Sequence, residues 1–121
     1  MNTKVLIVED TPANMKLTTL LLEREGYQVL QAENASDGIE LAREHRPGLI
    51  LMDIQLPGMD GLEATRILKT DTVTCAIPVI ALTAFAMKGD EDRIRAAGCD
   101  GYIAKPIQYK TFLAEVKNRL S

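Results

Sequence analysis

The sequence alternates five apolar runs with five segments of helical periodicity. Three of the runs, at residues 5–8, 49–52 and 79–82, are apolar at every position. Strands that are apolar on both faces are typical of a parallel sheet that helices cover on each side. The runs at 29–32 and 102–104 are weaker, and we expect them nearer the edges of the sheet.

Between these runs, apolar residues recur with a period near 3.6, which predicts five helices. Pro12 suits the first position of a helix, Asp60 suits a cap, and Gly26 and Gly98 suit helix ends. We expect these apolar residues to face the core: Ala13, Leu17, Leu20 and Leu21; Ala35, Ile39 and Ala42; Leu62, Ile67 and Leu68; Met87 and Ile94; and Tyr109, Phe112, Leu113, Val116 and Leu120.

This alternation predicts the α/β class, with a doubly wound, five-stranded parallel sheet and five helices on its two faces. The flavodoxin-like strand order 2-1-3-4-5 places the first and third strands side by side. In such sheets, ligands bind beyond the carboxyl ends of the strands, where the strand order reverses. The residues that follow each apolar run are therefore the candidates for function.

The length, composition and charge of the chain argue against several classes of protein. The chain has 121 residues, a length that fits one domain, and its 46% hydrophobic and 26% charged residues are ordinary globular values. A membrane span needs about 20 consecutive apolar residues, and no run approaches that length. The two cysteines form neither a disulfide framework nor a CxxC pair, so we expect the protein to reside in the reducing cytoplasm. A net charge of −3 argues against binding nucleic acid.

Acidic residues follow two strands that we expect to be neighbours. Glu9 and Asp10 end the first apolar run, and Asp53 ends the third. Two unit charges about 5 Å apart repel by about 3 kcal/mol at an effective dielectric constant of 20. Such a cluster either holds protons or binds a cation. Carboxylate oxygens without histidine or cysteine favour Mg²⁺, with Mn²⁺ or Ca²⁺ as substitutes, over zinc.

A hydroxyl and an ammonium group complete the set of strand ends. Thr83 ends the fourth run, and Lys105 with Pro106 follows the fifth. Carboxylates, a divalent cation, a lysine and a hydroxyl are the groups needed to place and neutralise a phosphoryl group in transfer. Asp53 is then the natural acceptor, because a carboxylate can act as a nucleophile.

These strand ends, together with Tyr102, closely resemble the CheY-like receiver domain of two-component response regulators. The resemblance extends from Lys4 to the last helix, and we expect residues 1–121 to form a single receiver domain. Residues 52–57 and 83–90 look most like a stand-alone regulator of cell division, and receivers of hybrid histidine kinases are also similar. The chain could therefore be a fragment of such a kinase.

The resemblance implies a role for each acidic residue. Asp53 would accept a phosphoryl group from a histidine kinase or a histidine phosphotransfer protein. Glu9, Asp10 and Asp53 would hold Mg²⁺, and Gln55 would add its backbone carbonyl. The protein would assist its own phosphorylation and dephosphorylation without being an enzyme for a separate substrate.

The resemblance also implies a switch. Lys105 would pair with phosphoryl oxygens, and the Thr83 hydroxyl would turn toward them, which lets Tyr102 rotate inward. The Lys105–Pro106 bond resembles the cis peptide of the family. The region of the fourth helix, fifth strand and fifth helix would then change shape and bind a downstream protein. We expect a monomer without nucleic-acid or membrane partners.

Three other functions compete with this interpretation. A nucleotide or flavin site would need a Gly-rich loop, whereas residues 9–12 read Glu-Asp-Thr-Pro. A magnesium-dependent phosphatase of the haloacid-dehalogenase type would carry a second aspartate where Gln55 stands. A receiver that has lost phosphorylation would only bind a partner.

Overall fold

The structure, a computed structural model, describes residues 3–56, 58–84 and 88–120. Met87, Phe85 and Pro57 lie outside the described residues, so the expected core position of Met87 is not addressed. The strands are β1 (Lys4–Val8), β2 (Gln28–Ala32), β3 (Leu49–Asp53), β4 (Val79–Thr83) and β5 (Gly101–Ala104). The helices are α1 (Pro12–Arg24), α2 (Ala35–His45), α3 (Gly61–Thr70), α4 (Lys88–Ala96) and α5 (Tyr109–Leu120).

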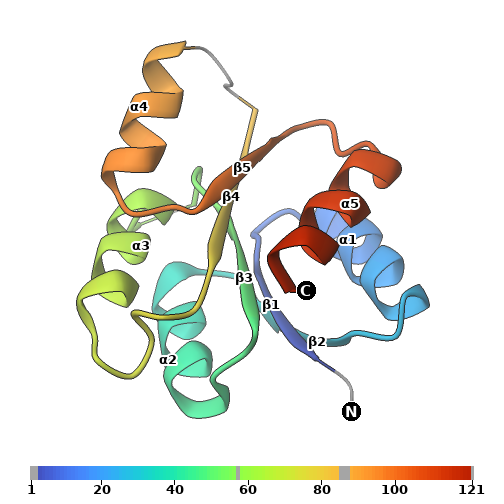
Figure 1. The fold of residues 1–121 in the computed structure, drawn as a ribbon, viewed down its shortest axis with the longest axis horizontal. Helices are drawn as coiled ribbons and strands as arrows, with labels where there is room; N and C mark the ends of the chain where they lie inside the picture. Colours follow the sequence, from blue (N-terminus) through green and yellow to red (C-terminus); the bar gives the residue numbers. More distant parts are fainter. Residues whose placement is uncertain (1–2, 57, 85–87, 121) are drawn as a thin grey trace.

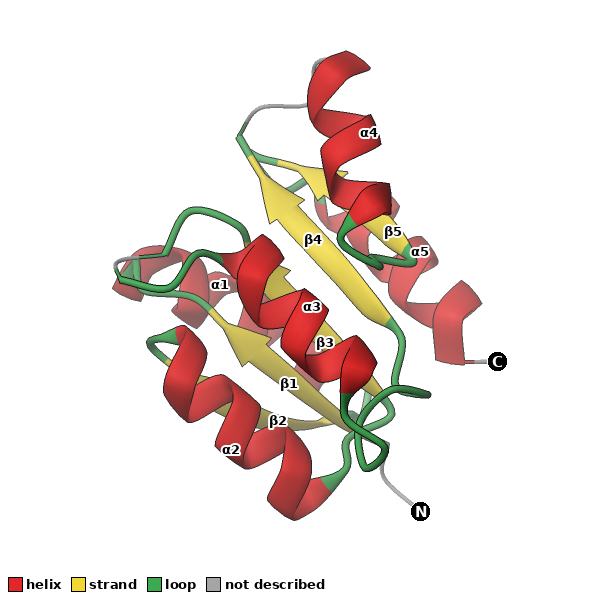
Figure 2. Cartoon of the chain, turned by 90° about the vertical axis from the view of Figure 1, so that its left-hand side faces the viewer, coloured by secondary structure: helices red, strands yellow, loops and turns green. Residues whose placement is uncertain are grey.

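The five strands form one parallel sheet in the order β2-β1-β3-β4-β5, as the sequence predicts. The weaker apolar runs are the edge strands β2 and β5. Helices α2, α3 and α4 cover one face of the sheet, and α1 and α5 cover the other (Figure 1, Figure 2). All strands run in one direction, so their carboxyl ends meet at one edge of the sheet.

The sheet separates two hydrophobic cores. Alternate residues of β1 show the division, because Leu6 and Val8 face α2 and α3, whereas Val5 and Ile7 face α1 and α5. The residues of β3 and β4 are buried throughout. This burial confirms that the three fully apolar runs are central strands. Among the described residues, no helix is both long and apolar enough to span a membrane.

Helix α1 buries a different face from the one that the sequence predicts. Of the four residues predicted to face the core, Leu21 is buried, but Ala13 is exposed and Leu17 and Leu20 are 43% and 53% exposed. Met15, Thr18 and Leu22 are buried as well. The Thr18 hydroxyl donates a hydrogen bond of 2.7 Å to the carbonyl oxygen of Asn14, so its polar group needs no partner in the core. The buried face of α1 therefore includes a threonine, and a pattern of apolar residues alone does not identify such a face.

Two further expected core residues are exposed. Ile67 lies on the outer side of α3, and Tyr109 begins α5 at the surface. Phe112 and Val116 fill the core beneath α5, while Leu113 and Leu120 are half-buried. Single apolar residues at a surface are common, because a folded protein has too little polar surface to cover itself.

The helix ends follow local chemistry. The Asp60 carboxylate accepts a hydrogen bond of 2.8 Å from the backbone N–H of Glu63, which confirms the predicted cap of α3. Gly26 and Gly98 follow α1 and α4 with φ values of 89° and 103°, which glycine adopts most readily. Of the described side chains of α4, only Ile94 is buried, so little apolar contact holds this helix to the sheet.

Candidate functional site

Three carboxylates meet where β1 and β3 end. Glu9 and Asp10 follow β1, and Asp53 is the last residue of β3. Val8, the last residue of β1, pairs in register with Met52, which directly precedes Asp53. One oxygen atom from each carboxylate lies within 4.8 Å of the others. Glu9 and Asp53 are 1% and 2% exposed, whereas Asp10 is exposed. The acidic cluster that the sequence predicts therefore has two buried members and one at the rim.

Lys105 reaches the same cluster from the far side of β4. Its ammonium nitrogen lies 2.9 Å from Glu9 Oε1 and 2.9 Å from Asp53 Oδ2. The backbone N–H of Lys105 donates a hydrogen bond of 2.7 Å to the carbonyl oxygen of Thr83, which anchors the lysine to the end of β4. The following bond to Pro106 is cis, as the resemblance implies. The lysine side chain thus bridges two carboxylates from separate strands.

Burial and the neighbouring charges change the acidity of these groups. Burial raises the pKa of Glu9 to about 7, and the hydrogen bond and negative charge of Asp53 act in the same direction. The Lys105 ammonium opposes this rise. Burial also disfavours the charged form of Lys105, but its hydrogen bonds to Asp53 and Glu9 outweigh burial and raise its pKa above 10.5. The charge of Glu9 therefore changes near neutral pH.

Each oxygen of Asp53 has a hydrogen-bond donor. The backbone N–H of Gln55 donates to Oδ1 at 2.8 Å, and the Lys105 ammonium donates to Oδ2. In Glu9, Oε2 accepts a longer hydrogen bond of 3.3 Å from the backbone N–H of Thr11. The Gln55 side chain is exposed, so the loop contributes to the site through its backbone. These donors hold the Asp53 carboxylate in one orientation.

Thr83 and Tyr102 connect the site to the outer part of the sheet. Thr83 is buried at the end of β4, and Tyr102 is half-buried on β5, paired in register with Ala81. The Tyr102 ring packs against the core on the α4 side. The Glu91 carboxylate of α4 accepts a hydrogen bond from the phenol and thereby raises the pKa of Tyr102 above 10.

Glu91 is a residue that the sequence reasoning missed. It belongs to a run of charged residues, and such a run is typical of a helix face that solvent covers, but Glu91 is half-buried. A signal was present, because Glu91 precedes the buried Ile94 by three positions, and residues three apart share a helix face.

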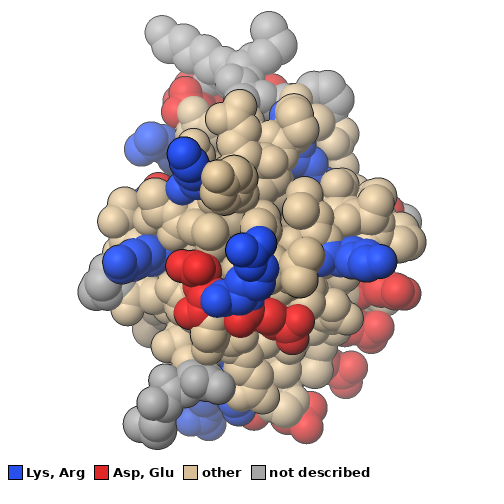
Figure 3. Space-filling model, turned by 90° about the vertical axis from the view of Figure 1, so that its right-hand side faces the viewer, with Lys and Arg blue, Asp and Glu red and all other residues tan. Residues whose placement is uncertain are grey.

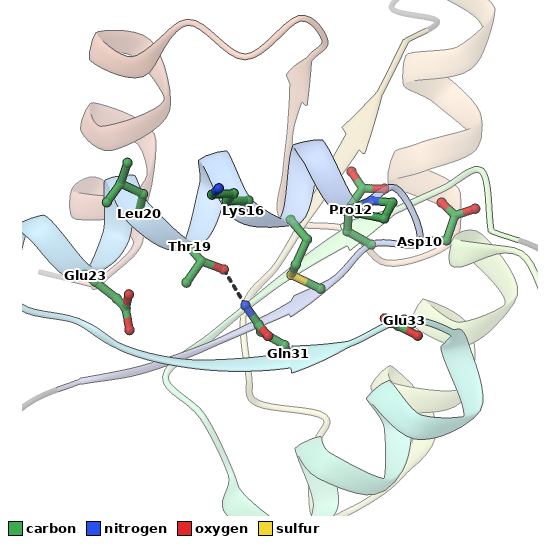
Figure 4. A pocket seen from close by; sticks show the side chains of 10 residues that line it. Asp10, Pro12, Lys16, Thr19, Leu20, Glu23, Gln31 and Glu33 are labelled. Carbon is green, nitrogen blue, oxygen red and sulfur yellow. Dashed lines mark hydrogen bonds between the residues drawn. The ribbon is translucent and has the colours of Figure 1, made fainter.

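A groove of about 400 Å³ opens beside the carboxylates, between α1 and β2 (Figure 4). Glu9 and Asp10 line one end, and Met15 and Leu20 give it apolar walls. A hydrogen bond of 2.9 Å from Gln31 Nε2 to Thr19 Oγ1 joins the two sides (Figure 4). The site is thus open to molecules that approach along α1.

The donor set fits a hard divalent cation. The cluster offers three carboxylate oxygens, with no histidine or cysteine among its described members. Magnesium prefers oxygen ligands and retains several waters, which the exposed position of Asp10 allows. Burial, assisted by the negative charge of Asp53, raises the pKa of Glu9, and a bound dication would favour the charged form of this carboxylate instead.

Comparisons with known proteins agree with this geometry. A family model of the response regulator receiver domain matches residues 5–117. The polar-differentiation response regulator DivK of Brucella anthropi is 55% identical over 116 residues, which cover 96% of this chain and 94% of the relative. A putative response regulator from Chloroflexus aurantiacus has a TM-score of 0.95 at 27% identity, over 99% of this chain and 98% of that chain.

A second solved structure bears on the acidic cluster. It is the receiver domain of the sensor histidine kinase PA1611 from Pseudomonas aeruginosa, with a magnesium ion coordinated in its active-site cleft. Its TM-score is 0.92 at 32% identity, over 99% of this chain and 98% of that chain. The magnesium ion is a property of that protein.

Proposed function

The chain belongs to the response regulator receiver domain family, and from this membership we propose that Asp53 accepts a phosphoryl group from a phosphohistidine. The donor is a histidine kinase or a histidine phosphotransfer protein. The observation that carries the proposal is the Lys105 ammonium, 2.9 Å from both Glu9 and Asp53 at the edge where the strands end.

The acceptor chemistry follows from the groups around Asp53. A carboxylate oxygen of Asp53 forms a bond to phosphorus while the bond between phosphorus and the donor imidazole nitrogen breaks. The electron pair of that bond leaves with the imidazole. The Gln55 N–H holds the carboxylate in place, and Lys105 supplies positive charge for the incoming phosphoryl oxygens. The protein assists this transfer and the later hydrolysis without acting on a separate substrate.

Mg²⁺ is the cofactor that these residues would hold, with Mn²⁺ as a substitute. Glu9, Asp10, Asp53 and the backbone carbonyl of Gln55 are the proposed ligands. The ion would neutralise negative charge that three carboxylates and a phosphoryl group bring together.

The proposed response is a shift between two conformations. The Thr83 hydroxyl turns toward the phosphoryl group, and the Tyr102 ring moves into the space that it leaves. Such a movement separates the phenol from Glu91 and changes the surface of α4, β5 and α5. A downstream protein partner binds this surface.

The proposed partners are proteins. On the face that α1 and α5 form, basic side chains are scattered among acidic ones instead of gathering in a patch (Figure 3). Binding to nucleic acid depends on clustered lysine and arginine. We propose a cytoplasmic monomer that binds its kinase or phosphotransfer protein and one downstream protein, without direct contact to nucleic acid or membrane.

The phosphatase alternative is disfavoured by Gln55. Its neutral side chain cannot protonate a leaving group, and it stands where a phosphatase of this chemistry needs a second aspartate. Multiple-turnover hydrolysis of phosphate esters would favour that alternative over the receiver.

Acetyl phosphate with Mg²⁺ tests the proposal directly. We expect intact-protein mass spectrometry to detect one added phosphoryl group, and Asp53→Asn to abolish the addition. EDTA should also prevent it. The matched control is Asp92→Asn, because Asp92 is an exposed aspartate of α4 outside the acidic cluster. Equal labelling of the wild type and the Asp53→Asn variant would refute the assignment.

A further inference from the structure

The first residue of α3, Gly61, packs against the backbone of the strand end that carries Asp53. A Cβ atom at Gly61 would overlap the carbonyl oxygen of Asp53 and would lie 2.6 Å from Cα of Ile54. Ordinary van der Waals contact of a Cβ atom begins near 3.4 Å. Its neighbours at this point are backbone atoms, which cannot rotate away as a side chain can.

We propose that Gly61 is a positioning residue for phosphoryl transfer: by lacking a side chain, it fixes the backbone that carries Asp53 and Gln55. The inference rests on the proposed function. Glycine is needed here because there is no room for a Cβ atom, and not because of its backbone conformation, since Gly61 is not among the glycines with positive φ. Alanine could adopt its conformation and favours helices more than glycine does.

Hydrogen bonds transmit the position of Gly61 to the acceptor. The N–H of Gly61 donates to the carbonyl oxygen of Ile54 at 3.3 Å, and the N–H of Ile54 donates to Leu82 at 3.1 Å. The next N–H along the chain, from Gln55, reaches Asp53 Oδ1 at 2.8 Å. A displacement of the peptide after Asp53 therefore moves the donor that orients the acceptor carboxylate.

Helix α3 cannot easily retreat to make room for a side chain. Leu62 and Leu68 are buried in the core beneath the helix. The Thr65 hydroxyl donates a hydrogen bond of 2.8 Å to the carbonyl oxygen of Gly61, which ties the first turn together. Because the helix is held on this side, a Cβ atom at position 61 shifts the backbone of Asp53 and Gln55.

The shift would affect two properties of the site. Asp53 and Gln55 supply a carboxylate and a backbone carbonyl to the proposed Mg²⁺ site, so the affinity for Mg²⁺ falls. The acceptor oxygen also leaves its aligned position, and a misplacement of about 1 Å can reduce a rate by about 100-fold.

Gly61→Ala tests the inference against two controls. The first control is Gly48→Ala at the opposite end of the sheet, where a Cβ atom would lie 2.9 Å from the Thr3 side chain and 3.1 Å from the Leu120 side chain. The second is Leu22→Ala, which opens a cavity beneath α1 and lowers stability without touching the Asp53 backbone. Circular dichroism establishes that each variant is folded.

For folded Gly61→Ala, we expect the Mg²⁺ dissociation constant to rise about tenfold and phosphorylation by acetyl phosphate at saturating Mg²⁺ to slow by about 10- to 100-fold. Both controls should stay within about twofold of the wild type. Unchanged Mg²⁺ affinity and rate in Gly61→Ala would overturn the inference. So would equal losses in Leu22→Ala, because the effect would then follow stability alone.

The wild-type protein provides a test that does not depend on the folding of the variant. During a titration with Mg²⁺ followed by NMR, we expect the amide signals of Gly61 and Gln55 to shift with the same midpoint, while that of Gly48 stays in place. A stationary Gly61 signal would overturn the inference. If the wild type binds Mg²⁺ but takes no phosphoryl group, the proposed function fails, while these Mg²⁺ measurements still decide the role of Gly61.

Discussion

Replacing Lys105 by methionine removes the ammonium that bridges Glu9 and Asp53 at 2.9 Å. Removing one partner of a buried ion pair costs about 3–5 kcal/mol, because the remaining charge loses its compensation. Glu9 can limit this cost by taking up a proton, since its pKa is about 7 with the lysine present. We therefore expect the free energy of unfolding to fall by about 3 kcal/mol at about pH 8 without divalent cations.

The loss should depend on pH and on Mg²⁺. At about pH 5.5, Glu9 is protonated in both proteins, so only Asp53 loses its counter-charge and the cost is about half as large. A ligand at about 100 times its dissociation constant adds about 2.7 kcal/mol to stability. Because Mg²⁺ replaces the missing positive charge, the variant should bind it at least as tightly as the wild type does.

Urea unfolding, followed by circular dichroism, measures these differences in EDTA and in saturating Mg²⁺. The matched control is Lys110→Met, an exposed lysine of α5 whose loss should cost no more than about 0.5 kcal/mol. The reasoning is refuted if Lys105→Met loses less than about 1 kcal/mol at about pH 8 in EDTA. Equal losses at the two pH values would refute the assignment of the titrating charge to Glu9.

Three other variants check the electrostatics. The raised pKa of Glu9 stabilises the fold below pH 4.5, and this contribution is lost as the pH rises through about 7. In urea unfolding without metal, the free energy of unfolding of the wild type should therefore fall by about 3 kcal/mol relative to Glu9→Gln over that range. Parallel stability curves for the two proteins would contradict this expectation. Lys69 Nζ donates to Asp100 and to the carbonyl oxygen of Ile77, both at 2.8 Å, so Lys69→Met should cost about 1–2 kcal/mol by the same assay. Burial raises the pKa of Asp100, but Lys69 holds it below 3.8, so the Lys69→Met variant should have a higher Asp100 pKa. An Asp100 pKa that stays the same in an NMR titration would count against the hydrogen bond from Lys69. Glu91→Gln should lower the pKa of Tyr102, measured by NMR of ring-labelled tyrosine, and no change would show that Glu91 does not hold the phenol.

The strand ends could be predicted because a local pattern marks them. Each apolar run stops at a polar residue, and parallel strands must all end at the same edge of the sheet. Glu9, Asp53, Thr83 and Lys105 follow from this rule without any knowledge of side-chain packing. The meeting of Glu9 with Asp53 required only that β1 and β3 be neighbours.

The buried face of α1 could not be predicted in the same way. The apolar pattern selected Leu17 and Leu20, but the helix turns Thr18 and Leu22 toward the sheet. Several leucines lie close together in this segment, so more than one stripe satisfies a helical period. The choice between them depends on which side chains fit beneath the helix, and on a hydroxyl that bonds to its own backbone.

The sequence by itself determined the order of the elements, the two-sided burial of the central strands and the polar residues that end them, because these follow from hydrophobic periodicity and chain direction. Only the tertiary structure decided that Lys105 contacts both Glu9 and Asp53, that Glu91 holds Tyr102, and that α3 approaches β3 too closely for a side chain at Gly61. These contacts join segments far apart in the chain or on separate elements. The distances between these groups depend on how the helices pack against the sheet, and no local sequence pattern determines that packing.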